Sequence, residues 1–98
     1  MELYRSIVEQ HEYVISKQLL RSGTSIGANV EEAGAGISRK DFRSKMAIAL
    51  KEARETKYWL RILKESRLVD VDVSQALVHA HELVRILSAI VKTTGEDP

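Results

Sequence analysis

One stretch of the chain decides the fold: SRKDFRSKMAIALKEARETKYWLRIL, residues 38–63. Its apolar and small side chains recur at alternating steps of four and three residues, at Phe42, Met46, Ala49, Ala53, Thr56, Leu60 and Leu63. This spacing places them along one face of an α-helix. Ser38 precedes Asp41 by three residues, which resembles a capping box and marks a helix start. We therefore predict a helix over residues 39–66, about 40 Å long.

A second helix is predicted on the C-terminal side, over residues 73–93. A wide apolar stripe runs along it and consists of Val73, Ala76, Leu77, Ala80, Leu83, Val84, Leu87, Ile90 and Val91. Asp72 and Ser74 are both suited to cap its start, because their side chains accept hydrogen bonds from the first amides of a helix. Residues 94–98 are polar and carry no stripe, so we expect this tail to fray.

A third helix is predicted on the N-terminal side, over residues 11–34. Its apolar residues have helical spacing, although Gly23 and Gly27 each cost about 1 kcal/mol relative to alanine in a helix interior. Small side chains surround both glycines and allow a neighbouring helix to approach closely. The prediction is a helix buried on more than one side, preceded by a helical stub over residues 1–9.

The composition also favours an all-α protein. Ninety-eight residues suffice for one domain, taken here as residues 1–98. The chain has only five glycines and one proline, Pro98, whereas sheet proteins need turn residues much more often. The three long helices are therefore expected to be antiparallel neighbours in one helical domain.

The sequence contains no recognisable catalytic or metal-binding motif. Cysteine is absent, which excludes disulfides and thiolate sites and fits a reducing compartment. His79 and His81 point about 160° apart on a helix and cannot chelate one ion together, so these residues and His11 are interpreted as surface or packing histidines. The chain lacks a signal peptide and a run of about 18 apolar residues. We expect a cytoplasmic protein that is not an enzyme, has no cofactor or metal and does not enter a membrane.

A polar stripe runs along the helix predicted over residues 11–34. It consists of Gln18, Arg21, Ser25, Asn29 and Glu32, which share an arc of about 80°. Buried polar groups need hydrogen-bond partners, so we predict a network with carboxylates of the long helix. The network joins Arg21, Gln18 and Asn29 to Glu52 or Glu55. The alternative is a carboxylate metal site of Glu31, Glu32, Glu52 and Glu55, although di-iron bundles also use Glu-x-x-His pairs, which this sequence lacks.

The charge distribution draws attention to the long helix. The formal net charge is +1, yet residues 39–67 hold ten basic and four acidic residues. The face opposite the apolar stripe carries Lys40, Arg43, Lys51, Arg54, Tyr58 and Arg61. Cations interleaved with an aromatic ring are typical of sequence-tolerant nucleic-acid binding. We predict such binding; the alternative is the solvated outer face of a protein-only scaffold.

The long helix also predicts self-association. Ile48, Trp59 and Ile62 form a second apolar line beside its main stripe. A monomer would leave this line in water, whereas a neighbouring subunit would bury it. We therefore expect a homo-oligomer.

Two runs carry a family resemblance: QLLRSGTSIGANVEEA, residues 18–33, and the long-helix stretch quoted above. The residues that match are Gln18, Arg21, Ser25, Ile26, Asn29 and Glu32, followed by Asp41, Phe42, Ala49, Glu52, Glu55 and Leu60. On these the chain resembles the four-helix-bundle family of ribosomal RNA intervening-sequence proteins. That family includes the accessory variability protein of diversity-generating retroelements.

The resemblance implies an up-and-down antiparallel four-helix bundle, with a first helix that is shortened here because only ten residues precede HEYVISKQLLRS. It also implies a homopentamer. A dimer or helix-swapped form is our second choice, because missing first-helix residues alter the packing of a bundle. Family members linked to nucleic acid or to a reverse transcriptase have a basic surface. The implied partners are therefore further copies of the chain, RNA or DNA, or a reverse transcriptase.

Overall fold

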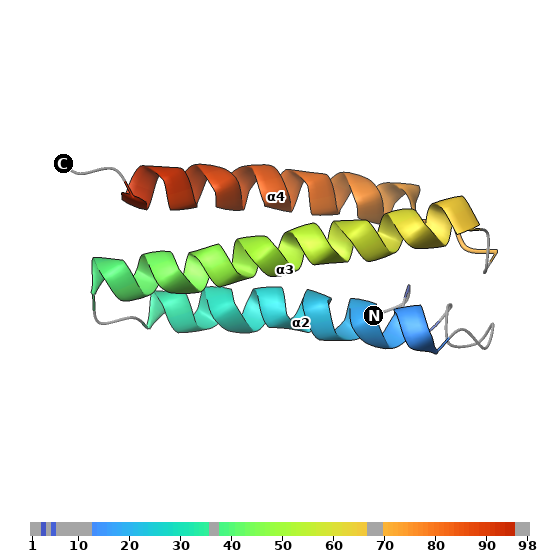
Figure 1. Cartoon of the computed structure of the whole chain (residues 1–98), viewed down its shortest axis with the longest axis horizontal. Coiled ribbons are helices and arrows are strands. Elements are labelled where there is room, and N and C mark those ends of the chain that lie inside the picture. Colours follow the sequence, from blue (N-terminus) through green and yellow to red (C-terminus); the bar gives the residue numbers. More distant parts are fainter. Residues whose placement is uncertain (1–2, 4, 6–12, 36–37, 67–69, 96–98) are drawn as a thin grey trace.

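The computed structural model describes residues 3, 5, 13–35, 38–66 and 70–95. Over these residues the chain forms three α-helices, labelled as in Figure 1: α2 (Val14–Gly34), α3 (Arg39–Ser66) and α4 (Ser74–Gly95). No strand occurs in the described part of the chain, so the all-α prediction is confirmed there. The helical stub predicted over residues 1–9, and with it the shortened first helix of a four-helix bundle, falls almost wholly outside the described residues.

The bounds of α3 match those predicted from its apolar stripe. The amide of Asp41 donates to Ser38 Oγ at 3.1 Å, and the amide of Phe42 donates to the carbonyl of Ser38 at 3.0 Å. Ser38 therefore caps α3 as predicted. In contrast, α2 begins at Val14 after Tyr13, which makes no side-chain cap, three residues later than predicted.

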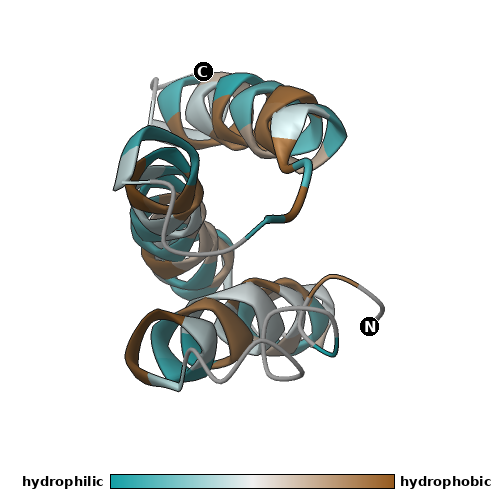
Figure 2. Ribbon diagram, turned by 90° about the vertical axis from the view of Figure 1, so that its right-hand side faces the viewer, coloured by the Kyte–Doolittle hydropathy of each residue, from teal (hydrophilic) through white to brown (hydrophobic). Residues whose placement is uncertain are grey.

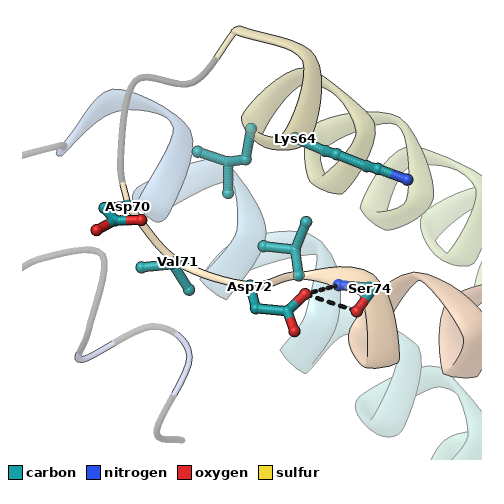
Figure 3. Close-up of a pocket in the computed structure, with 7 residues that line it drawn as sticks. Lys64, Asp70, Val71, Asp72 and Ser74 are labelled. Atoms are coloured by element: carbon teal, nitrogen blue, oxygen red, sulfur yellow. Dashed lines mark hydrogen bonds between the residues drawn. The ribbon is translucent and has the colours of Figure 1, made fainter.

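Asp72 holds the start of α4, as Figure 3 shows. The hydroxyl and the amide of Ser74 donate to Asp72 Oδ1 at 2.6 and 2.9 Å. Of the two candidate caps, Asp72 is thus the acceptor. These two bonds stabilise the ionised carboxylate, so they hold the pKa of Asp72 below its usual value. The turn borders a cavity of about 310 Å³, which Lys64 and Asp70 also line.

The C-terminal end of α4 lies further along the chain than predicted. Our prediction that the tail frays from residue 94 is wrong for Thr94 and Gly95, which belong to the helix. The Thr94 hydroxyl donates to the carbonyl of Ile90 at 2.8 Å. The guanidinium of Arg39 donates to the carbonyls of Thr93 and Thr94 at 3.4 and 3.2 Å. A cation at the C-terminal end of a helix also interacts favourably with the helix dipole. These contacts explain why α4 extends two residues beyond the predicted end.

The long helix α3 lies between the other two (Figure 1). It packs against α2 on one side and α4 on the other, whereas α2 and α4 do not contact each other in the described part of the chain. Viewed end-on in Figure 2, the three helices form an open arc with α3 in the middle. The molecule is therefore elongated, measuring 49 × 20 × 17 Å.

Two apolar clusters join α3 to its neighbours. The first lies near the connection to α4 and contains Ile15, Leu19, Leu60, Leu63, Val73 and Ala80. The second contains Ile26, Ala33, Met46, Ala49, Leu50, Ala53 and Leu87. Ala49 and Ala53 are completely buried, so small side chains set how closely the helices approach. The hydroxyl of Thr56 also donates to Ser22 Oγ at 2.8 Å, which joins α3 to α2 between the clusters.

The prediction that α2 is buried on more than one side is wrong for the described structure. A Cβ added at Gly23 or Gly27 would have no described neighbour within 4 Å. The reason is the arc, because α4 packs on the far side of α3 and leaves α2 with one described helix neighbour. The open side instead holds a mostly apolar cavity of about 400 Å³, lined by Leu3 and by residues of all three helices, including Leu20, Leu60 and Leu83.

The tight packing at Ala49 leads to a testable prediction. Replacing Ala49 with leucine should destabilise the fold by about 1–3 kcal/mol, because a full-size side chain overpacks a site with no free space. Ala47→Leu is the matched control, since Ala47 is exposed on the opposite side of α3 and should change stability little. Urea unfolding followed by circular dichroism measures both variants. Equal urea midpoints for the two variants would contradict the tight packing at Ala49.

Acid should weaken the start of α4 through Asp72. The pKa of this carboxyl is lower in the folded chain, so its contribution is complete above the ordinary aspartate pKa and is lost as pH falls through the folded value. The melting temperature of the wild type should therefore exceed that of Asp72→Asn near neutral pH. This difference should shrink below about pH 4. Thermal melts across this range test it, with the exposed Glu82→Gln as control. A difference that is constant with pH would contradict the role of Asp72.

Candidate nucleic-acid interface

The predicted basic face of α3 exists in the structure and is open to solvent. Its members Lys40, Arg43, Lys51, Arg54, Tyr58 and Arg61 are all exposed. At 100° per residue they fall within an arc of about 80°. This arc lies opposite the buried Ala49 and Ala53. Since α2 and α4 pack on other sides of α3, this face has no described helix as a neighbour. We call these six residues the α3 face.

Few charges compensate the α3 face. The guanidinium of Arg61 lies 4.0 Å from the Glu65 carboxylate, and both side chains are more than half exposed, so this pair is weak. Within the described residues, no ion pair engages Lys40, Lys51 or Arg54. These three cations therefore remain available to a ligand.

Arg43 is placed differently from the other members of the α3 face. Its guanidinium lies over the C-terminal end of α4, so closely that a Cβ added at Gly95 would lie 2.6 Å from Arg43 Nε. Gly95 thus provides the space that the guanidinium occupies. Arg43 joins the α3 face to the end of α4, a contact that the sequence pattern of α3 alone did not indicate.

Tyr58 supplies the aromatic surface of the α3 face. Its side chain is 55% exposed. The ring meets Trp59 edge to face, with centroids 5.1 Å apart and planes inclined by 70°. Trp59 therefore supports the Tyr58 ring while leaving much of it in water.

A contact between α3 and α4 borders the α3 face and was missed from the sequence. Lys57 Nζ lies 3.2 Å from His81 Nδ1. An ammonium group only donates, so the imidazole nitrogen accepts in this geometry. The sequence contained a usable signal, because His81, Arg85 and Lys92 recur at steps of four and seven residues along α4.

The polar stripe of α2 meets the long helix largely where it was expected. Arg21 forms ion pairs with both Glu52, at 3.1 Å, and Glu55. Its Nε also donates to Gln18 Oε1 at 3.2 Å. The Arg21 side chain is 49% exposed, so this network lies at the edge of the helix interface rather than inside it. Its contribution to stability is correspondingly small.

Asn29 and Ser25 do not join this network. Asn29 Nδ2 donates to the carbonyl and hydroxyl of Ser25, one turn earlier in the same helix, at 2.9 and 3.2 Å. The prediction that Asn29 reaches Glu52 or Glu55 is therefore wrong. Asn29 lies about 12 Å along α2 from Arg21, beyond reach of the same carboxylates.

The carboxylates proposed as an alternative metal site are distributed over separate contacts. Glu52 and Glu55 pair with Arg21, whereas Glu32 pairs with Lys45 at 2.7 Å, and Glu31 is exposed on α2. No group of three potential metal ligands converges anywhere in the described residues. None of the described helices meets the length and hydropathy that a membrane span requires.

The apolar line predicted as a subunit interface is divided. Trp59 and Ile62 pack against the first apolar cluster of the same chain, because α2 and the start of α4 cover this end of α3. Both side chains are only partly buried, so their place in a subunit interface stays a prediction. Ile48, further toward the start of α3, remains 41% exposed.

Two comparisons with known proteins found a match. The family described as 23S rRNA-intervening sequence protein matches residues 1–89. A crystal structure of a protein with unknown function from the S23 ribosomal protein family of Bacteroides thetaiotaomicron is 46% identical to the chain, with a TM-score of 0.85. The alignment covers 93% of this chain and 86% of that protein. No match was found among curated proteins. The chain belongs to the 23S rRNA-intervening sequence protein family.

Proposed function

We propose that the protein binds the phosphate backbone of nucleic acid through the α3 face and catalyses no reaction. The observation that carries the proposal is the exposed row of Lys40, Lys51 and Arg54, which no ion pair engages within the described residues. Exposed cations of this kind bind phosphates by releasing the counterions that surround them. The excess of ten basic over four acidic residues within residues 39–67 supports the same function.

Tyr58 adds an aromatic surface that stacks on an unpaired base where the ligand offers one. Contacts to phosphates and stacking carry little sequence information, so the proposed binding tolerates many sequences. The family description refers to a 23S rRNA intervening sequence, which makes RNA the first ligand to test and DNA the second. A reverse transcriptase, implied by the resemblance to the retroelement accessory protein, is a candidate protein partner.

Self-association is the second part of the proposal. Val30, Ile48 and Ile86 are between 41% and 50% exposed and lie on different helices. Burying apolar surface of this kind between subunits is favourable at about 25 cal/mol per Å². We favour the homopentamer implied by the family resemblance, with a dimer or helix-swapped form as the second choice. Several copies would also multiply the number of α3 faces available to one nucleic acid.

The alternative function is a protein-only scaffold whose basic face keeps the assembly soluble. The i,i+4 pair of Arg61 with Glu65 favours this alternative, because such pairs are ordinary on solvated helix faces. The two functions differ in whether the cations of α3 are needed for a ligand.

Salt dependence distinguishes the two functions. Changing Arg43, Arg54 and Arg61 together to alanine should flatten the slope of log affinity against log salt by about two to three units, since each lost phosphate contact removes about 0.9. Anisotropy of a labelled RNA measures the slope. Lys17→Ala is the control, because Lys17 is exposed on α2 and lies outside the α3 face. An affinity for RNA that changes neither with salt nor with the triple substitution supports the scaffold instead.

The oligomer is tested by light scattering on the purified chain. We expect a mass that is a multiple of the 11.1 kDa chain at micromolar concentration. Ile48→Arg should reduce this mass if the exposed end of the apolar line lies in the interface, since a charge is costly to bury there. Ala47→Arg provides a neighbouring exposed control. A wild-type mass of one chain would refute self-association.

A further inference from the structure

The side of α4 that borders the α3 face carries basic residues of its own. His81, Arg85 and Lys92 are all exposed. Their spacing places them within an arc of about 40° on one side of the helix. Their role was not indicated by the pattern of α3, and no contact inside the described structure accounts for Arg85 or Lys92.

Two contacts show which way this side of α4 faces. At one end, His81 Nδ1 lies 3.2 Å from Lys57 Nζ. At the other end, Arg39 of α3 donates to the carbonyls of Thr93 and Thr94. Because the helices are antiparallel, these contacts align Arg85 and Lys92 with the part of α3 that lies between Lys57 and Arg39.

The aligned part of α3 is the centre of the α3 face. Counting from the two contacts, Arg85 lies level with Lys51 and Arg54, and Lys92 lies level with Arg43. The position of Arg43 over Gly95 agrees with this alignment. Two parallel rows of cations therefore run side by side along α3 and α4, on helices whose axes are about 8–10 Å apart.

The electrostatics between the two rows favour an anion. The carbonyls at the C-terminal end of α4 would normally repel phosphate, but the guanidinium of Arg39 occupies two of them. On the other side of α3, Glu52 and Glu55 are engaged by Arg21 and point toward α2. The strip between the rows is thus left with a surplus of positive charge.

We propose that Arg85 and Lys92 form a second row of phosphate contacts, and that the two rows together bind a nucleic-acid duplex. This inference rests on the proposed function. Proteins that bind single strands use several aromatic rings on which successive bases stack. The two rows contain one such ring, Tyr58, whereas paired straight rows of cations suit phosphates on both sides of a groove.

The duplex also defines the role of Tyr58. Bases inside a duplex are stacked on one another, so they offer no face to the Tyr58 ring. Tyr58→Ala should therefore weaken the binding of a single strand more than the binding of a duplex. This variant distinguishes backbone binding by two rows from binding by base stacking.

The experiment compares full-length wild type with Arg85→Gln/Lys92→Gln, using a labelled RNA duplex and one of its separated strands as probes. For the duplex, the double variant should flatten the slope of log affinity against log salt by about two units. Between about 50 and 200 mM salt, its loss of affinity should therefore be roughly ten-fold smaller than that of the wild type. Lys17→Gln is the control, since it removes one exposed positive charge on α2 outside both rows. Circular dichroism confirms that each variant keeps its helices.

The outcomes separate this inference from the proposed function. A wild-type slope for the double variant, together with a flattened slope for Arg54→Gln/Arg61→Gln, overturns the second row and leaves the proposed function standing. Tighter wild-type binding to the single strand than to the duplex overturns the duplex assignment. If the wild type binds neither probe in a salt-dependent way, both the second row and the proposed function are overturned.

Discussion

The structure depends on the packing of α3 against two helices at once. Ala49 and Ala53 are fully buried at this interface, and α2 and α4 have no contact with each other in the described part of the chain. Every described interhelical contact therefore passes through α3. The same constraint leaves the opposite side of α3 exposed, and that side carries the cations. Core packing and the candidate binding surface are thus two faces of one helix.

The polar contacts align the helices rather than hold them together. Arg21 meets Glu52 and Glu55, and Glu32 meets Lys45, which sets the antiparallel alignment of α2 with α3. These side chains are substantially exposed, except that of Glu52, so the pairs contribute little free energy individually. On the other side, Arg39 and Lys57 align α4 with α3. This second alignment brings the basic side of α4 beside the α3 face.

The sequence predicted the features that depend on one helix and missed those that depend on the arrangement of helices. Periodicity gave the bounds of α3, and residue type gave the Ser38 cap. The same reasoning identified Arg21 with its two carboxylates, but failed for Asn29, which lies further along α2. It could not show that Trp59 packs inside the chain or that Arg39 reaches the end of α4. Helical spacing shows which residues share a face but not which helix covers that face.

The most direct test of a ligand surface on α3 is lysine footprinting, in which acetylation rates are measured by mass spectrometry with and without bound RNA. Binding at the α3 face should protect Lys40 and Lys51 on α3, with Lys17 on α2 reacting as before. All three are exposed in the structure, so each should react readily in the free protein. Unchanged rates at Lys40 and Lys51 in the presence of saturating RNA, or protection of Lys17 alone, would contradict a ligand surface on α3.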